Sequence, residues 1–505
     1  MNPENVGQAL FEQLMQTIRR PVELQAASSR LWWDGKTHVP PKGQGAHGIV
    51  KSRLEREAHS ALMEGETGDI LARLDGRMDM LSEKQRLLVE RLLCSFKRQS
   101  ALNEGFVGRS SIVIEAAAAA WARAREKQDF AIFQPHLEAV IGIQREQARF
   151  MGASPDSVYE VLFQGYEPGM TVTRLREIMD LSLDRLQALY HRLVASERVP
   201  NAGFLSGDFS PGKQRNLGLA LLHTMGLDME AIDYDQSAHP FMSGQSRGDC
   251  RVTTRFDPRY LPMALFSTMH EGGHAMVEQQ TDPMLDWTQI PGFVYSLGLH
   301  ESQSRLWENL IGRSLDFWSY FYPQLRVLFP QFRGVLIGDF VRGVNAVRRQ
   351  PIRVQADEVS YNLHVLIRTE IEIGLLSGDI DVADLPQVFA DKMEEYLGVR
   401  PANVSEGALQ DIHWSIGAFG YFPTYMLGNF CSGQLFHSFC EKIPNWRREF
   451  DIGDFTSLAR WLGENVHRFL PVATLDDLLV RVTGEPLNPD YWFEYVEKKM
   501  DWVYQ

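Results

Sequence analysis

Three residues with metal-binding and acid–base side chains lie within one short stretch, His270-Glu271-Gly272-Gly273-His274. Histidines four positions apart lie on one face of an α-helix, so both imidazoles can bind the same metal ion. Glu271 is rotated by about a hundred degrees from His270 around such a helix. Its carboxylate can therefore reach a water molecule held by the metal without being a ligand, as a general base must. The motif predicts a catalytic zinc site that cleaves peptide bonds.

The alternative is a chance match, which a chain of 505 residues would contain with a probability on the order of a few per cent. The surroundings favour a real site. Phe266, Met269 and Val277 give the helix an apolar face, and Asp282-Pro283 marks its end. Each of the two glycines costs a helix roughly 1 kcal/mol relative to alanine, which indicates that something approaches the backbone closely there.

A catalytic zinc ion usually takes three protein ligands and leaves the fourth position to water, so a third ligand must lie elsewhere. The downstream candidates are Glu278, Glu301 and Glu308. Glu278 is on the same helix and too near His274 to complete a tetrahedron. Glu301 follows a loop long enough for a second helix to fold back beside the first. We therefore expect Glu301 to be the third ligand, with Glu308 as the alternative one or two turns later.

Most of the chain has the apolar spacing and the composition of helices. One helical pattern covers residues 7 to 30, and a break rich in glycine and proline is expected between Trp33 and Gly48. Further along, Thr171 is expected to cap a helix from Val172 to Ser196. We find no internal repeat, low-complexity segment or long linker, and so we expect a single domain over residues 1–505.

A second pattern begins at Pro211, which is expected to start a helix that ends near Met225. The segment from Cys250 to Phe256 instead alternates with period two, with Arg251 and Thr253 on one face, and this predicts a short strand. An extended peptide could bind by main-chain hydrogen bonds to the edge of such a strand. The alternative is a purely structural hairpin.

The composition excludes some classes of protein. A net charge of −14 argues against a nucleic-acid partner, because a phosphate backbone attracts concentrated lysine and arginine. No run of about 18 apolar residues could span a membrane, and the N-terminal residues do not form a secretory signal. The four cysteines have no C-x-x-C spacing and are expected to be reduced thiols. We expect a cytoplasmic protein.

The order of several motifs resembles the M32 metallocarboxypeptidases, the thermostable carboxypeptidase group. These motifs are His270 to His274, His300-Glu301-Ser302-Gln303, Asp249-Cys-Arg251-Val-Thr253 (D-x-R-x-T), Ile352-Arg353-Val-Gln-Ala356-Asp357 (I-R-x-x-A-D), and Gly407 to Trp414 (G-x-x-Q-D-x-H-W). Other landmarks place the resemblance over nearly the whole chain. One departure is mild: Thr37-His38-Val39-Pro40, after Trp33-Asp34, is less apolar than in the family pattern.

The resemblance implies a mostly α-helical, saddle-shaped zinc-peptidase fold with a deep central groove and a small β-sheet at the active site. Residues from about 1 to 230 would form an N-terminal helical wall, and residues from about 231 to 505 the catalytic zinc-binding part. Family members commonly act as homodimers. They remove single residues from peptides that have a free C-terminal carboxylate, with broad specificity and poor activity at proline.

Roles for further residues follow from chemistry and from the resemblance together. Arg353 is expected to bind the terminal carboxylate, because a planar guanidinium can hold a carboxylate through two hydrogen bonds. Tyr421 or His413, with Tyr425 behind them, would donate to the oxyanion. Asp357 would orient a ligand histidine.

Four other motif residues are expected to bind substrate or brace the strand: His239, Asp249, Arg251 and Thr253. We expect one Zn²⁺ per chain, with Co²⁺ as a substitute. Two alternatives to a carboxypeptidase remain at this point. One is a zinc oligopeptidase or dipeptidase, which would cut at another distance from the terminus. The other is an inactive helical binding protein, for which a general base beside three ligands would have no purpose.

Overall fold

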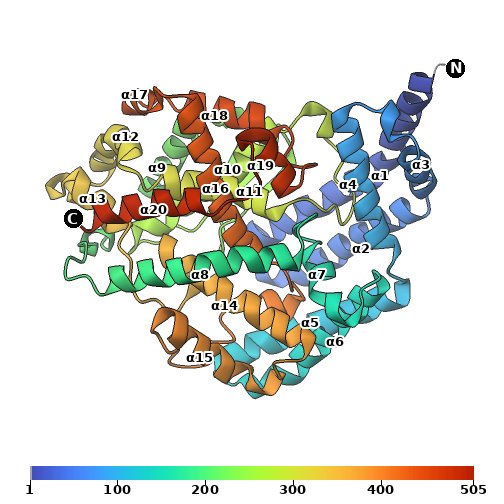
Figure 1. Cartoon of the computed structure of the whole chain (residues 1–505), viewed down its shortest axis with the longest axis horizontal. Coiled ribbons are helices and arrows are strands. Elements are labelled where there is room, and N and C mark those ends of the chain that lie inside the picture. The colour runs from blue at the N-terminus through green and yellow to red at the C-terminus, as the bar shows by residue number, and fades with distance from the viewer. Residues whose placement is uncertain (1–2) are drawn as a thin grey trace.

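The computed structural model describes residues 3–505, apart from the side chains of residues 3–5 and 245. The described chain is mostly helical, with one small sheet (Figure 1). The first helices are α1 Pro3–Thr37, α2 Gln44–Met63, α3 Thr67–Asp75, α4 Glu83–Ser100, α5 Glu104–Lys127, α6 Gln134–Phe150, α7 Val158–Phe163, α8 Val172–Val194, α9 Pro211–Met225 and α10 Leu261–Gln280. The others are α11 Leu297–Arg305, α12 Leu315–Leu328, α13 Ile337–Val344, α14 Glu358–Ser377, α15 Leu385–Leu397, α16 Pro423–Lys442, α17 Trp446–Asp451, α18 Thr456–Leu462, α19 Leu475–Thr483 and α20 Asp490–Val503.

The expected helix starts are confirmed at α8 and α9, α8 ends at Val194 and not at Ser196, and the expected end of α1 is corrected. Thr171 caps α8, its hydroxyl accepting a hydrogen bond from Arg174 N, and α9 begins at Pro211. The break expected from Trp33 is shorter than predicted, because α1 continues to Thr37, whose hydroxyl donates back to Trp33 O. The consecutive prolines that follow, which cannot donate backbone hydrogen bonds, lie between α1 and α2.

The predicted strand is confirmed as β3, Asp249–Thr254, but its place in the sheet differs from the expectation. β3 is the central strand, with β1 Ile232–Gln236 parallel on one side and β2 Met242–Ser246 antiparallel on the other. Both sides of β3 therefore already carry main-chain partners, so a peptide cannot add to it. The edge strands are β1 and β2.

Close backbone packing fixes α10, α11 and α16 at the centre of the molecule. A Cβ atom at Gly273 of α10 would lie 2.6 Å from the carbonyl oxygen of Gln303 in α11. A Cβ atom at Gly428 of α16 would lie 2.9 Å from the Glu301 side chain. The glycines thus let three helices approach to a distance that any side chain would prevent. This explains why helix-weakening glycines lie inside the metal-binding motif.

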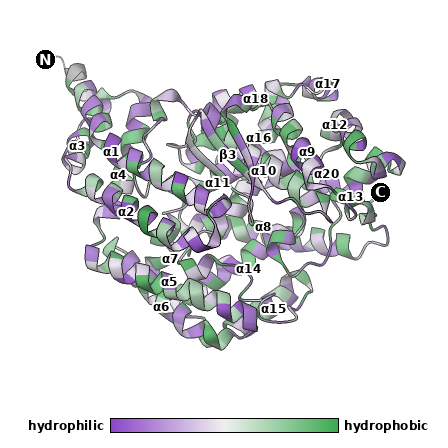
Figure 2. Ribbon diagram, turned by 180° about the vertical axis from the view of Figure 1, so that it is seen from behind, coloured by the Kyte–Doolittle hydropathy of each residue, from purple (hydrophilic) through white to green (hydrophobic). Residues whose placement is uncertain are grey.

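Two clusters of buried apolar residues stabilise the fold. The larger one joins α5–α20 and the sheet, and the smaller one lies among α1–α4, where Leu14, Ile18, Leu71 and Leu88 are fully buried. Helices α1–α4 lie together at one side of the molecule, at the blue end of the colour scale in Figure 1. Figure 2 shows hydrophilic and hydrophobic residues interspersed along the helices.

Two expectations from composition can be compared with the structure. No helix in the described part of the chain is long and apolar enough to cross a membrane. All four cysteines lie among the described residues, and each has a free thiol.

Candidate active site

Helices α10 and α11 bring three metal-binding side chains together. His270 and His274 lie one turn apart on α10, and Glu301 faces them from α11. Oε2 of Glu301 is 3.6 Å from Nε2 of His270 and 3.5 Å from Nε2 of His274. One nitrogen from each ring and one carboxylate oxygen all lie within 4.8 Å of one another. Ligand atoms about 2.1 Å from an ion at tetrahedral angles would be about 3.4 Å apart, so these donors fit a zinc-sized ion.

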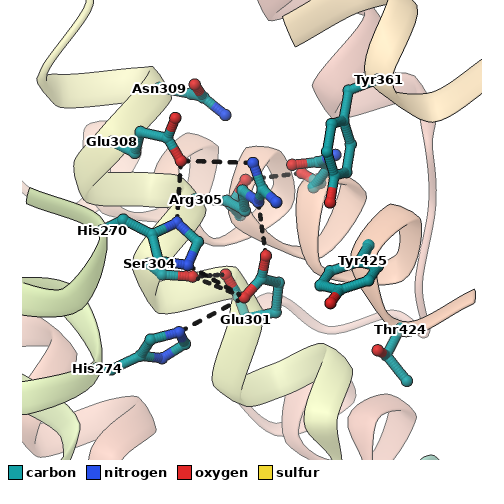
Figure 3. Close-up of polar contacts among 12 residues, drawn as sticks. His270, His274, Glu301, Ser304, Arg305, Glu308, Asn309, Tyr361, Thr424 and Tyr425 are labelled. Atoms are coloured by element: carbon teal, nitrogen blue, oxygen red, sulfur yellow. Dashed lines mark hydrogen bonds and ion pairs between the residues drawn. The ribbon is translucent and has the colours of Figure 1, made fainter. Parts of the chain in front are cut away.

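Charged side chains hold two of the three candidate ligands (Figure 3). Arg305 donates to Oε1 of Glu301 at 2.7 Å, which leaves Oε2 directed at the histidines. Nδ1 of His270 lies 2.9 Å from Oε2 of Glu308. Glu308 itself is paired with Arg305 and Arg313, each at 3.4 Å. Burial opposes ionisation of Glu308, but the hydrogen bond from His270 and the charge of Arg305 lower its pKa to about 2.

Glu308 is the carboxylate that contacts a candidate ligand histidine, and the expectation for Asp357 is wrong. Asp357 caps α14, where its Oδ1 accepts from the backbone N–H groups of Val359 and Ser360. Its other oxygen accepts from the Ser360 hydroxyl and from Arg348 N. With both oxygens bound at a helix end, Asp357 orients α14 rather than an imidazole.

The candidate ligands open into a cavity of about 290 Å³. Its walls are Pro240, Phe241, Met242, His270, Glu271, His274, Tyr295, Leu297, His300, Glu301, Tyr421, Thr424 and Tyr425. Glu271 lies in this wall with only 6% of its surface exposed. Burial raises the pKa of Glu271 above its ordinary value, against the opposing charges of His270 and His274. A carboxylate with a raised pKa is a stronger base, as proton abstraction from water requires.

Of the three residues expected near the oxyanion, two line the cavity and the third lies behind them. Tyr421 and Tyr425 line the cavity, with ring centroids 5.3 Å apart. Burial raises the pKa of both phenols, which keeps their protons available for donation. His413 is not among the residues found to line the cavity. Its Nε2 lies 3.3 Å from the Tyr425 hydroxyl, so it contacts the site through that tyrosine.

Arg353 is buried beside the cavity, 5% exposed, within an ion-pair cluster. Its Nε and Nη2 donate to Asp411 at 3.0 and 2.8 Å, and its Nη1 donates to Tyr361 at 2.7 Å. Asp411 also accepts from the fully buried Arg368 at 2.6 Å. The guanidinium of Arg353 lies 5.1 Å from the ring of Tyr425, which does line the cavity. Two of its five N–H groups remain for a ligand after these three bonds.

The D-x-R-x-T residues support the cavity wall rather than forming it. Arg251 stacks over the Trp33 ring of α1 at 4.6 Å, and Asp249 pairs with Arg251 and with Arg30 of α1. Thr253 is fully buried, and its hydroxyl oxygen lies 3.0 Å from both N and O of Phe241. These contacts fix the segment that contributes Phe241 to the cavity.

His239 is exposed next to that segment, and its carbonyl oxygen accepts a hydrogen bond from the Ser237 hydroxyl. The residues found to line the cavity begin one position later, at Pro240. His239 therefore lies beside the cavity wall.

Sequence reasoning missed Arg305 and the supporting role of Glu308. Arg305 is the last residue of α11, and Glu308 lies in the π-helical turn that continues it, η8, Leu306–Ile311. Arg305 could have been found, because a residue four positions after Glu301 lies on the same helical face. The pairing of Glu308 with His270 depends on how two helices pack, which spacing alone does not give.

The chain is similar to known peptidases over nearly its whole length. The family model described as "Carboxypeptidase Taq (M32) metallopeptidase" matches residues 13–500. The chain is 34% identical to thermostable carboxypeptidase 1 of Thermus thermophilus, with 100% of both chains covered. It is 33% identical to carboxypeptidase 1 of Bacillus subtilis, over 96% of this chain and 97% of the relative.

Solved structures agree with this match. An M32 carboxypeptidase from Deinococcus radiodurans superposes with a TM-score of 0.94 at 31% identity, over 98% of this chain and 99% of the other. Metallocarboxypeptidase 1 of Trypanosoma cruzi superposes with a TM-score of 0.90 at 31% identity, over 97% and 99%. The similarity in sequence and in fold thus covers nearly the whole of each chain.

Proposed function

The chain belongs to the M32 family of metallocarboxypeptidases, and from this we propose that it is a zinc enzyme that releases single amino acids from the C-termini of peptides. The family assignment makes it a metal-dependent peptide hydrolase. The choice of zinc, the residue roles and the specificity are our proposals. The observation that carries them is the convergence of His270, His274 and Glu301 on one point of a cavity that also contains Glu271.

Four residues carry the proposed chemistry. His270, His274 and Glu301 hold the ion, which when bound polarises the scissile carbonyl and lowers the pKa of a water molecule. Glu271 takes the proton from the attacking water and delivers it to the leaving amine. Its burial supports this role, because a carboxylate screened from solvent keeps the proton close to the reacting atoms.

Tyr421 is our proposed donor to the oxyanion, because it lines the cavity and keeps its proton. His413 would act on the site indirectly, through its contact with the Tyr425 hydroxyl. Burial and the charge of Arg353 lower the pKa of His413 to about 3, so it is neutral and adds no charge to the site.

Charge balance supports Arg353 as the group that recognises the terminal carboxylate. Among the described residues of the cluster, two guanidinium groups share one carboxylate, that of Asp411. One positive charge therefore remains uncompensated in a buried place, which is costly. The C-terminal carboxylate of a substrate would supply the missing negative charge. An internal peptide segment has no terminal carboxylate and could not supply it.

The lining of the cavity supports substrates of varied sequence. Aromatic and aliphatic side chains form much of its wall, and such surfaces accept many side chains without specific hydrogen bonds. We retain two finer proposals on the family resemblance alone, broad specificity and poor cleavage next to proline. Asp249, Arg251 and Thr253 would support the wall that substrate touches, whereas His239 lies beside that wall.

The test is hydrolysis of one peptide with a free C-terminal carboxylate and of its amidated twin, each with and without phenanthroline. We expect stepwise loss of single residues from the free peptide only, abolished by the chelator and restored by Zn²⁺ or Co²⁺. Equal cleavage of both peptides would indicate an oligopeptidase and remove the role of Arg353. Cleavage of neither would leave a binding protein as the remaining explanation.

A homodimer and a cytoplasmic location also remain proposals. Their support is the resemblance to the family and, for the location, the four free thiols. Light scattering coupled to size exclusion would give twice the mass of one chain for a dimer. A mass equal to that of one chain would exclude it.

A further inference from the structure

The segment formed by α11 and η8 contacts each of the three candidate metal ligands. Its Arg305 donates to Glu301, and its Glu308 lies against Nδ1 of His270. The third contact has a different character. The ring of His300 lies parallel to the ring of His274, with centroids 4.3 Å apart and an interplanar angle of 11°.

The far nitrogen of His274 differs from that of His270. Nδ1 of His274 is buried and has no partner among the residues that the structure describes. In metal sites this nitrogen usually donates to a carboxylate or carbonyl, which fixes the ring for the ion. His270 follows that rule through Glu308 and His274 does not. Some other contact must therefore restrain the imidazole of His274.

We propose that His300 is a positioning residue for the metal, and that it fixes His274 by ring stacking in place of a hydrogen bond. A parallel ring at this distance blocks rotation of the His274 imidazole out of its plane, because the two rings would collide. His300 is itself restrained, since the ring of Tyr295 meets it edge to face at 5.7 Å. The inference rests on the proposed function, because it assumes that His274 binds a metal ion.

The backbone makes this arrangement specific. His300 immediately precedes Glu301 on α11, so one short helix supplies both the third ligand and the restraint on the second. His300 is not part of the three-residue group of donors found in the described chain, which leaves it free to act by contact. It also lines the cavity, so the alternative is a residue that binds substrate through a ring nitrogen.

Two variants separate these roles. His300→Phe keeps a flat ring and removes both nitrogens, whereas His300→Leu keeps a similar bulk and removes the flat ring. Each protein is stripped with a chelator and titrated with Zn²⁺ against a competing chelator. We expect His300→Phe to bind Zn²⁺ within about twofold of wild type and His300→Leu to bind about 3- to 10-fold more weakly, the size of one aromatic pair contact. The absorption spectrum of bound Co²⁺ should follow the same order.

Several outcomes would overturn the proposal. Unchanged Zn²⁺ affinity in His300→Leu would show that stacking restrains nothing. Equal loss in both variants would show that a nitrogen, and not the ring face, is needed. As a control, thermal unfolding of the metal-free proteins tests whether each variant is folded. The separate variant His274→Ala tests the metal site itself, because full retention of Zn²⁺ there would contradict the proposed function and not only the role of His300.

Discussion

Glu308 holds the ring of His270, with its Oε2 2.9 Å from Nδ1. The contact joins η8 to α10 and pairs a carboxylate with a candidate ligand histidine. Two arginines keep Glu308 charged, so the acceptor is always available. A carboxylate that accepts a hydrogen bond from the far ring nitrogen makes the near nitrogen a better ligand.

Replacing Glu308 should therefore weaken metal binding more than it weakens the fold. We expect Glu308→Gln to lower Zn²⁺ affinity by about 10- to 100-fold, measured by competition with a chelator. Asp357→Asn is the matched control, because Asp357 caps α14 and touches no candidate ligand. The control should retain wild-type affinity, and a loss of equal size there would show that any buried carboxylate change has this effect.

Substitution of the general base and substitution of a ligand should differ in their effect on metal content. Glu271→Gln removes the base but leaves the three ligand atoms, so we expect full metal content and a fall in kcat of about 10²- to 10⁴-fold. His274→Ala should lose both metal and turnover. Elemental analysis and peptide hydrolysis measure the two quantities, and a Glu271→Gln protein with wild-type kcat would contradict the assignment of the base.

Recognition of the terminal carboxylate should depend on Arg353. A charged hydrogen-bonded contact contributes about 1.5–3 kcal/mol, so Arg353→Gln should reduce kcat/KM on free peptides by about 10- to 100-fold. The preference for free over amidated peptide should fall by the same factor. Arg326→Gln is the control, because Arg326 is exposed in the last turn of α12 and is not among the residues found in the cavity wall. A preference unchanged in Arg353→Gln would move the role to another group.

The approach of α11 to α10 requires glycine at position 273. A methyl group there would meet backbone atoms of Gln303 and Ser304 at 2.6 and 2.8 Å, and backbone cannot move aside easily. We expect Gly273→Ala to destabilise the protein by about 1–3 kcal/mol and to lower its metal content. Gly142→Ala in α6 is the control, because its methyl group would meet nothing within 4 Å among the described atoms. That change should be neutral or stabilise by up to about 1 kcal/mol, as read from midpoints of denaturant unfolding.

The buried Glu167 should make stability depend on pH. Burial raises its pKa from 4.5 to about 8, although it accepts from the Ser296 hydroxyl and Gly298 N at the start of α11. The folded state thus holds a proton that the unfolded chain releases above its own lower pKa. This contribution is complete below pH 4.5 and is lost as the pH rises towards 8.

Glu167→Gln, which cannot ionise, should remove that part of the pH dependence. Between pH 5 and pH 8, the unfolding midpoint of wild type should fall more steeply than that of Glu167→Gln. Parallel profiles for the two proteins would contradict the raised pKa. Peptide hydrolysis by Glu167→Gln at pH 7 is a second measurement, because Glu167 binds the start of α11 and α11 carries Glu301.

The sequence by itself determined the helical class, the metal-binding motif and the family. The four-residue spacing of His270 and His274 places both side chains on one face of α10, because four residues make about one turn of any α-helix. Local chemistry likewise fixed Thr171 as a cap and Pro211 as a helix start. The glycines in the motif also predicted a close backbone contact. Only the structure shows that the partner is α11.

Tertiary structure alone decided which groups meet across elements. The period-two pattern predicted β3, but only pairing shows that β3 is the central strand and has no free edge. Asp357 and Glu308 are both carboxylates near motif residues, and nothing in their spacing shows that one caps a helix and the other holds His270. The stacking of His300 on His274 likewise depends on the distance and angle between two helices. Local spacing fixes neighbours within one helix, whereas contacts between helices are set by the packing of the whole core.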